Sequence, residues 1–341
     1  MTQARISPEF LAVFRQKADA AGRMTFAQFM EIALYDPRVG YYCQQRPRVG
    51  YAAGTDFFTA STSGPIFGEL IAAACVSLLN GSDPRDFKFV EIGAEAGAGV
   101  LSGISHPFGS LQTIRVGDPL EISGPCVVFS NELFDAQPCQ RLVFRSGAWR
   151  ERGVALNDGV FSEVELPLTR VSAPLPATAV EGYAFDVPWS AKILADRIAR
   201  QPWTGLFVAC DYGKTWRELT EHCPAGTARA YYRHTQSNDL LAHPGEQDLT
   251  CHICWDWLSE TLAHHGFASP TVPSQEAFFV NHAETCIAAA ITQEASRFSP
   301  KKQALLQLLH PSHLGQKFQV LHARREALTG KPLAPEAPFN L

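Results

Sequence analysis

One stretch of the chain, Phe87 to Gly99, constrains the fold more than any other part of the sequence. Its first part, Phe87–Ile92, is an apolar run with the length of a buried strand, and three glycines follow at Gly93, Gly97 and Gly99. We predict a strand, a tight glycine turn and the start of a helix, whose free N–H groups face a ligand. This pattern is typical of an open α/β sheet with a nucleotide-type site at the carboxyl ends of its strands.

The glycine spacing differs from the dinucleotide-binding pattern G-x-G-x-x-G. The glycines fall at positions 93, 97 and 99, and a carboxylate, Glu91, precedes them. An acid followed by one residue and a glycine resembles the first motif of S-adenosylmethionine-dependent methyltransferases. Glycine turns after strands are also common structural devices, so the motif by itself leaves both interpretations open.

Composition narrows the class of protein. The chain has 341 residues, 46% of them hydrophobic and 18% charged, which is enough for one large α/β domain or one domain with an appendage. A net charge of -5 gives no basic face for a nucleic-acid partner. The longest apolar run, Leu70 to Leu79, is too short to cross a membrane. Nine scattered cysteines and no apolar leader after Met1 predict a reduced, cytoplasmic protein.

The first 80 residues predict helices that pack on the core. Ser7-Pro8 is typical of a helix start, Thr25 to Gln28 forms a capping-box pattern, and Asp36-Pro37 ends the second helix. A third helix is expected over Pro65 to Leu79. We therefore expect a helical segment over residues 1–80 and an α/β domain over 81–341.

Two further apolar runs, Cys126–Ser130 and Leu206–Cys210, predict buried parallel strands. Alternating residues around Ser146-Gly147 and Asp158-Gly159 predict an antiparallel hairpin insertion at about 140–170. A linker over 173–178 returns to the helix before the last of these strands.

Polar residues follow these strands where ligands bind in open α/β sheets. Asn131, Glu132 and Asp135 come after one strand and Asp211 after the other. Carboxylates there can hold an amine or guanidinium by charge-assisted hydrogen bonds and orient its lone pair. The alternative is that Glu132 and Asp135 cap the next helix.

Ten motifs occur in order along the chain: Leu34-Tyr35-Asp36-Pro37, Gly40-Tyr41-Tyr42, Gly54 to Thr59, Phe67-Gly68-Glu69, Asn131 to Pro138, Trp149 to Arg152, Asp211-Tyr212-Gly213, Gly226 to Tyr231, Gly245 to Thr250 and Leu314 to Leu321. Together they resemble the MidA family, which contains mitochondrial complex I assembly-factor methyltransferases and their bacterial relatives. The resemblance implies a class I methyltransferase (Rossmann-like) fold, a doubly wound sheet, with S-adenosylmethionine as cofactor and, for the mitochondrial members, protein arginine as acceptor.

The candidate site residues fall into three groups. The candidate catalytic residues are Asn131, Glu132, Asp135 and Asp211, and the candidate cofactor-binding residues are Asp56, Thr59, Glu91, Gly93, Gly97 and Gly99. Arg229 and Tyr231 are candidates for contact with a protein substrate or partner, although such residues are equally ordinary on a protein surface. Cys251-His252-x-Cys254 lacks the second ligand pair of a zinc site, so we predict no metal.

Two departures from the family pattern weaken the cofactor prediction. Glu95 stands where a glycine should let the backbone approach the ligand. Only the residues from Val100 to Ser130 separate the glycine turn from Asn131, so about one βα unit is missing, and with it the carboxylate for the ribose. Asp118 can replace that carboxylate, but Gly117-Asp118-Pro119 favours a turn.

Two functions remain open on this basis. The first is a methyltransferase of protein arginine or a similar nitrogen. The second is a catalytically impaired relative that acts as an assembly or protein-interaction factor. We expect weak or absent binding of S-adenosylmethionine, and the sequence leaves the substrate and the oligomeric state undetermined.

Overall fold

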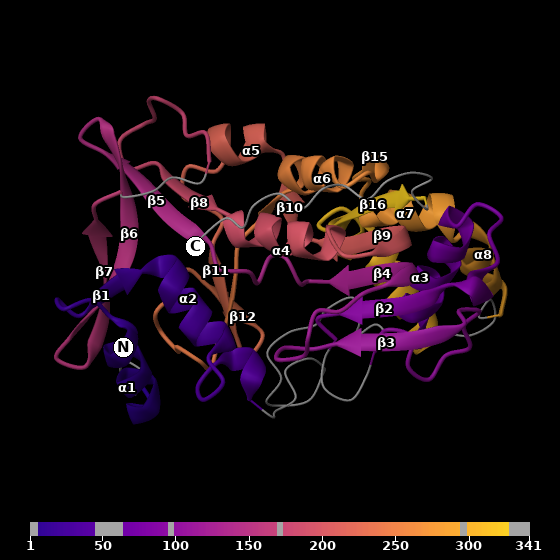
Figure 1. Cartoon of the computed structure of the whole chain (residues 1–341), viewed down its shortest axis with the longest axis horizontal. Coiled ribbons are helices and arrows are strands. Elements are labelled where there is room, and N and C mark those ends of the chain that lie inside the picture. Colours follow the sequence, from indigo (N-terminus) through magenta and orange to yellow (C-terminus); the bar gives the residue numbers. More distant parts are fainter. Residues whose placement is uncertain (1–5, 45–63, 95–98, 169–172, 294–298, 327–341) are drawn as a thin grey trace.

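A six-stranded sheet forms the centre of the molecule (Figure 1). The computed structural model describes residues 6–44, 64–94, 99–168, 173–293 and 299–326. The strands lie in the order β15-β16-β9-β4-β2-β3. Their bounds are β2 (Lys88–Ile92), β3 (Ser110–Ile114), β4 (Gly124–Asn131), β9 (Trp203–Asp211), β15 (Ala268–Thr271) and β16 (Gln319–Arg325).

The four neighbouring strands β3, β2, β4 and β9 run parallel, and β16 runs antiparallel to both β9 and β15. Side chains of β4 are buried on both faces of the sheet. Val127 and Phe129 pack in one apolar cluster, and Cys126 and Val128 pack in the other. A strand covered on both faces needs a continuous apolar run, which is why β4 and β9 were predictable from the sequence.

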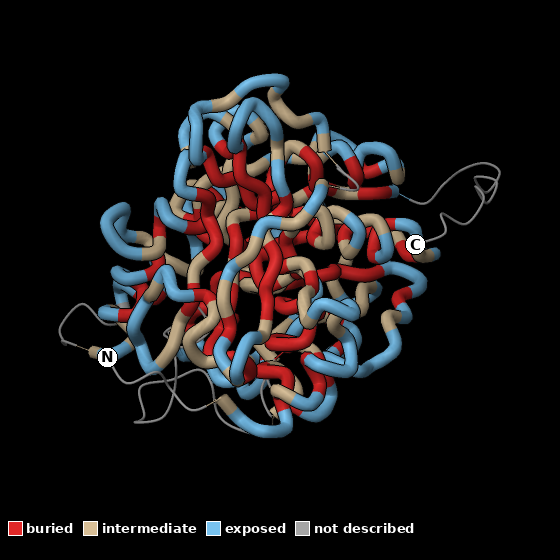
Figure 2. The backbone as a smooth tube through the Cα atoms, turned by 90° about the vertical axis from the view of Figure 1, so that its left-hand side faces the viewer, coloured by how far each residue is buried: buried red, intermediate tan, exposed pale blue. Residues whose placement is uncertain are grey.

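Helices cover both faces of this sheet, so the predicted doubly wound arrangement is confirmed. One face packs against α3 (Pro65–Leu78), α7 (Gln275–His282), α8 (Glu284–Gln293) and α9 (Pro300–Leu309). The other face packs against α4 (Trp189–Ala199) and α6 (Trp255–His264). The buried strands run through the middle of the molecule, while the exposed turns lie at its surface (Figure 2). Short helical turns occur at η1 (Tyr41–Cys43), η3 (Pro84–Asp86) and η4 (Pro311–Gly315).

The sheet ends at β3, and the connections around this strand are short. Residues 115–123, which lead from β3 to β4, form turns and no helix, as the shortened spacing predicts. The predicted helix start after the glycine turn is absent from residues 99–109, which also form turns and bends. This segment contains Gly99, Gly103, Gly109 and Pro107, all poor helix formers, which explains the difference.

The predicted hairpin insertion is confirmed as a second, antiparallel sheet. It consists of β1 (Arg23–Thr25), β5 (Gln140–Arg145), β6 (Ala148–Asn157), β7 (Val160–Leu166) and β8 (Ala184–Val187). Both residues of the Ser146-Gly147 and Asp158-Gly159 turns have positive φ, as tight hairpin turns require. The sequence did not predict β1 or β8, because strands of three or four residues carry little periodic signal.

The helices of the predicted N-terminal segment pack in two places. Both α1 (Pro8–Lys17) and α2 (Phe26–Tyr35) pack on the antiparallel sheet, where Phe10, Phe14 and Phe29 surround Phe161. Their predicted caps are present, since Ser7 accepts a hydrogen bond from the N–H of Phe10 and Thr25 forms a capping box. In contrast, α3 packs on the large sheet. The division into residues 1–80 and 81–341 stays a prediction.

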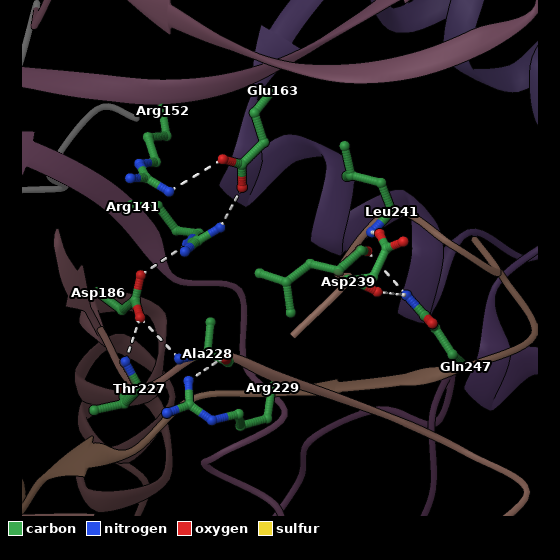
Figure 3. A network of polar contacts seen from close by, with 11 residues as sticks. Arg141, Arg152, Glu163, Asp186, Thr227, Ala228, Arg229, Asp239, Leu241 and Gln247 are labelled. Atoms are coloured by element: carbon green, nitrogen blue, oxygen red, sulfur yellow. Dashed lines mark hydrogen bonds and ion pairs between the residues drawn. The ribbon is translucent and has the colours of Figure 1, made fainter. Parts of the chain in front are cut away.

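A buried ion network joins the antiparallel sheet to the chain that follows α5 (Trp216–Glu221) (Figure 3). Arg141 Nε donates to Asp186 Oδ1 at 2.9 Å, and Arg141 Nη1 donates to Glu163 at 2.7 Å. Asp186 Oδ2 accepts the N–H groups of Thr227 and Ala228 at 2.6 and 2.8 Å. Asp186 therefore fixes the segment that leads into the next strand.

Two small sheets lie between these larger ones. Their strands are β10 (Gly213–Lys214), β11 (Arg229–Tyr232), β12 (Thr235–Ser237), β13 (Asp248–Thr250) and β14 (Ile253–Cys254). β11 pairs antiparallel with β12 and β13, and β10 pairs parallel with β14. None of the helices in the described ranges is long and apolar enough to cross a bilayer.

Candidate functional site

The carboxyl ends of β2, β4 and β9 meet at one edge of the large sheet. Ile92 pairs with Ser130, and Asn131 pairs with Cys210. The chain goes from β2 to β3 on one side and returns to β4 on the other, so the order of strands reverses between β2 and β4. Ligands of open α/β sheets bind at such a point. The prediction that Glu91, Asn131 and Asp211 share one edge is confirmed.

The glycine turn after β2 folds back over a carboxylate. Gly93 has φ +83°, and its N–H donates to the Ile114 carbonyl at 2.9 Å. Glu91 Oε2 accepts the N–H of Val100 at 2.7 Å. A Cβ at Gly99 would lie 2.7 Å from Glu91 Oε2, so any other residue there would displace the Glu91 carboxylate. Predicted cofactor residues Asp56, Thr59 and Gly97, together with Glu95, lie outside the described residues.

A cavity of about 240 Å³ lies beside this turn and is lined by Glu91, Gly99, Thr113 and Arg115 among others. Burial raises the pKa of Glu91 to about 7, although the Val100 N–H and the Arg115 charge act in the opposite direction. A carboxyl that titrates near neutral pH beside a glycine turn is a candidate functional group.

This pKa predicts a pH dependence of stability. The folded protein favours protonated Glu91, so the free energy of unfolding should fall as the pH rises from about 4.5 to about 7. Glu91→Gln should reduce that fall, and Glu9→Gln, at an exposed helix position, should not. Urea unfolding at pH 4.5 and pH 7.5 measures the difference. Identical pH dependence in wild type and Glu91→Gln would show that burial does not perturb this carboxyl.

One candidate catalytic residue, Glu132, directly follows β4 in an unusual backbone conformation. Asn131 Nδ2 donates to Glu132 Oε1 at 3.0 Å. Glu132 has φ +50°, which lies in the left-handed region of backbone conformation that residues other than glycine rarely adopt. Such a residue costs about 1 to 3 kcal/mol and occurs at functional sites as well as in tight turns. The backbone therefore presents Glu132 at this edge at an energetic cost.

Asp211 and Asp135 lie below Glu132 and are almost fully buried. Asp211 Oδ2 accepts the N–H of Phe134 at 2.9 Å, and its Oδ1 accepts the N–H of Tyr212 at 2.8 Å. We therefore assign Asp211 to holding the loop, and its catalytic role stays a prediction. Asp135 is 3% exposed, and its Oδ1 has no hydrogen-bond partner among the described residues. Burial and the neighbouring Asp211 and Glu132 carboxylates raise its pKa well above the usual range.

The alternative that Glu132 and Asp135 cap a helix is wrong. The segment between β4 and β5 contains bends and a turn but no helix, so it offers no helix N-terminus to cap. A buried carboxyl with an unpaired oxygen needs another explanation.

Sequence reasoning missed three residues next to this edge. Asp248 on β13 is 4% exposed, and the Tyr42 hydroxyl donates to its Oδ1 at 2.8 Å. The Tyr35 hydroxyl donates to the Ala136 carbonyl at 3.0 Å. All three lie within the family motifs Leu34 to Pro37, Gly40 to Tyr42 and Gly245 to Thr250. Their place in these motifs was the only sequence signal that could have identified them.

The structure brings one of the two candidate substrate residues to the acids. Tyr231 pairs with Asp248 across β11 and β13, and burial together with the Asp135 and Asp248 carboxylates raises its pKa. The Arg229 guanidinium donates instead to the Ala228 carbonyl at 2.6 Å and lines a separate cavity of about 320 Å³. The predicted contact of Arg229 with a substrate therefore stays a prediction, because its guanidinium is not bonded to the acids at the edge of the large sheet.

The described ranges contain no group of three or more metal-ligating side chains. Burial lowers the pKa of His252 to about 4, and Cys254 starts α6 without a side-chain cap. The absence of zinc at Cys251-His252-x-Cys254 stays a prediction.

The doubly wound sheet, its antiparallel strand β16 and the site at the switch point define a class I methyltransferase fold. Comparison with solved structures supports this class. A Burkholderia thailandensis protein, crystallised with bound S-adenosyl-homocysteine, superposes with a TM-score of 0.80 at 23% identity, over 95% of each chain. A native crystal structure from the same organism gives a TM-score of 0.76.

Sequence comparisons identify the family. Residues 111–272 match the family described as "Putative S-adenosyl-L-methionine-dependent methyltransferase". The Drosophila melanogaster protein arginine methyltransferase NDUFAF7 homolog, mitochondrial, is 24% identical over 90% of this chain and 83% of its own length. The Homo sapiens protein arginine methyltransferase NDUFAF7, mitochondrial, is 22% identical over 89% of this chain and 80% of its own length. These matches confirm the predicted resemblance to the MidA family of S-adenosylmethionine-dependent methyltransferases.

These relatives correct one prediction. We expected a cytoplasmic protein from the scattered cysteines and the missing apolar leader. The relatives from fly, frog and human are named as mitochondrial proteins, which contradicts that expectation. Cysteine usage reports a reducing environment and does not distinguish among reducing compartments.

The residues of the edge fit part of the family's cofactor. S-adenosylmethionine supplies a methyl group on a positively charged sulfur when it is bound. Gly93, at positive φ, allows a close approach of the backbone, and Glu91 and Asn131 supply polar groups beside it. The end of β3 carries no carboxylate, since Arg115 stands there, and Asp118 folds back to accept the Arg115 N–H at 2.9 Å. The predicted turn at Gly117-Asp118-Pro119 is confirmed.

We expect the missing carboxylate to weaken cofactor binding. A charged hydrogen bond of this kind is worth about 1.5 to 3 kcal/mol, so its loss costs roughly tenfold to a hundredfold in affinity. Arg115→Asp should restore about tenfold. Arg150→Asp, which makes the same charge change at an exposed position of β6, should change little. Calorimetry with S-adenosylmethionine measures both, and a low-micromolar Kd for the wild type would contradict the expectation.

Proposed function

We propose that this protein transfers a methyl group from S-adenosylmethionine to a cationic nitrogen of a protein, with arginine as the acceptor. The observation that carries the proposal is the set of carboxylates at the switch-point edge. Glu132 and Asp135 follow β4 at this edge, and Asp211, the last residue of β9, holds their loop. The relatives named as protein arginine methyltransferases support arginine as the acceptor class.

The carboxylates suit a guanidinium for two reasons. First, ionised oxygens accept short hydrogen bonds from its N–H groups and fix the nitrogen that reacts. Second, a nitrogen that gains a methyl group must lose a proton, and a neighbouring carboxylate can accept it. Positioning of this kind accounts for most of the catalysis that the protein itself has to supply.

Transfer of a radiolabelled methyl group tests the proposal. The full chain is incubated with labelled S-adenosylmethionine at saturating concentration and with peptides that contain arginine or lysine. We expect label on the arginine peptides, identified as methylarginine by mass spectrometry. No transfer at millimolar cofactor would reject the methyltransferase function.

A second function, as an assembly or interaction factor, is supported by the outer edge of β3. Its five residues, Ser110–Ile114, include no charge and no proline, and Leu111 is 46% exposed. The opposite edge strand, β15, contains Pro270 and a register shift. Proteins usually protect edge strands in this way, because an open edge pairs with other chains.

Sedimentation tests this second function. If the β3 edge joins two copies of the chain, Leu111→Lys should dissociate the assembly, and Val280→Lys, an equally exposed change on α7, should not. A wild type that is monomeric at all concentrations would remove this support.

A further inference from the structure

Asp248 is a buried acid that belongs to neither of the strands that carry the candidate catalytic residues. It starts β13 and lies opposite Tyr231 of β11, so both side chains lie on the same face of this small sheet. Only 4% of Asp248 is exposed. The Tyr42 hydroxyl donates to its Oδ1 at 2.8 Å and fixes the orientation of the carboxylate.

Asp135 faces this carboxylate from the loop after β4. The Cys251 N–H donates to the Asp135 carbonyl at 2.8 Å, which ties the loop to the chain directly after β13. Asp135 Oδ1 is buried without a hydrogen-bond partner in the described part of the chain, and no ion pair there includes Asp135. The Asp248 charge is one of the causes that raise the Asp135 pKa.

An oxygen buried in this way is costly unless something completes its hydrogen bonding. Two acids, one on β13 and one in the loop after β4, the latter with an unpaired oxygen, suit a ligand that has donors on two sides and a positive charge. A guanidinium is planar and has five N–H donors in a fixed arrangement. An ammonium has three donors around one strongly hydrated centre and costs more to desolvate.

We infer that Asp248 and Asp135 bind the guanidinium of the acceptor from two sides, and that Tyr42 positions Asp248 for this contact. This inference rests on the proposed function and adds to it a residue, a sheet and a preference for guanidinium over ammonium. It also gives the N-terminal segment a role in the site, because Tyr42 lies in η1, a short distance after α2.

The end of α2 also holds the loop that carries Asp135. The Tyr35 hydroxyl donates to the Ala136 carbonyl and accepts a hydrogen bond from Gln137 at 3.2 Å. The rings of Tyr35 and Tyr42 stack with their centroids 5.6 Å apart. One aromatic pair thus holds both the loop that carries Asp135 and the carboxylate of Asp248.

Binding without cofactor tests the inference separately from methyl transfer. The probe is the peptide acetyl-Gly-Gly-Arg-Gly-Gly-amide, compared with its lysine counterpart by calorimetry. The wild type should prefer the arginine peptide by roughly tenfold, since a charged hydrogen bond is lost with lysine. Asp248→Asn should weaken the arginine peptide by about tenfold or more and leave the lysine peptide nearly unchanged.

Two further variants separate binding from structure. Tyr42→Phe should raise KM for the arginine peptide by about three- to tenfold with a smaller change in kcat, because it removes the hydrogen bond from Tyr42 that orients the Asp248 carboxylate. Asp239→Asn, an exposed acid in the loop between β12 and β13, is the matched control and should change neither quantity. The melting temperatures of all variants should stay close to that of the wild type.

The outcomes are distinguishable. Equal affinity of wild type and Asp248→Asn for the arginine peptide overturns the inference, even if methyl transfer occurs. A loss of binding that follows a large drop in melting temperature, with Tyr42→Phe unaffected, also overturns it. Absence of methyl transfer with Asp248-dependent peptide binding rejects the proposed function and leaves this binding site in place.

Discussion

Glu132→Gln should reduce methyl transfer by roughly a hundredfold to a thousandfold, the range seen when one preorganised group at a reacting centre is removed. The substitution keeps the size of the side chain and its contact with Asn131, where the Asn131 amide donates to Glu132 Oε1 at 3.0 Å. It removes the negative charge that a cationic acceptor needs. Because Glu132 is only partly buried, the melting temperature should remain almost unchanged.

Initial rates at saturating S-adenosylmethionine, together with thermal unfolding, measure these two effects. Glu165→Gln is the control, since it removes a carboxylate from the surface pair with Arg145 and leaves the edge intact. A large loss of stability in Glu132→Gln would assign the residue to packing. Unchanged turnover with unchanged stability would remove Glu132 from the mechanism.

Asp186→Asn should have the largest effect on stability, about 3 to 5 kcal/mol in the free energy of unfolding. The variant leaves Arg141, whose side chain is 7% exposed, beside a neutral amide in place of a carboxylate. It also disturbs the acceptor for the N–H groups of Thr227 and Ala228. The retained pair between Arg141 and Glu163 places the expected value at the lower end of this range.

Urea unfolding measures this loss, and Glu165→Gln again serves as control. Its partner Arg145 is 54% exposed, and exposed pairs contribute at most about 1 kcal/mol. A loss below about 1 kcal/mol in Asp186→Asn would show that the network is not stabilising, as found for buried ion pairs whose desolvation cost exceeds their attraction. Since Asp186 orders the chain before β11, peptide binding near Tyr231 should weaken together with stability.

The central strands β4 and β9 were predictable because they are covered on both faces and carry continuous apolar runs, each followed by an amide or carboxyl group. β2 combines apolar residues with Lys88 and Glu91 and was predicted together with the glycine turn that follows it. Capped helices such as α1 and α2 were predictable for a similar reason, since the capping residues act within one turn of the chain. The shortened region before β4 was also visible as a simple count of residues.

The acceptor side of the site was not predictable in the same way. Asp248 lies in a strand of three residues, and its partner Tyr42 lies 206 positions earlier in the chain. No local pattern records such a contact. The same holds for Asp211, which follows a strand as predicted but turns both oxygens toward backbone N–H groups.

The sequence by itself determined the doubly wound sheet, the glycine turn, the hairpin insertion and the edge at which Glu91, Asn131 and Asp211 meet. These features depend on periodicity, turn residues and strand direction, all of which act over a few residues. Only the tertiary structure decided which carboxylates have a free oxygen, which of them hold the backbone, and that Tyr42 and Asp248 join the site. Burial and long-range hydrogen bonds determine those properties, and they exist only once distant segments pack together.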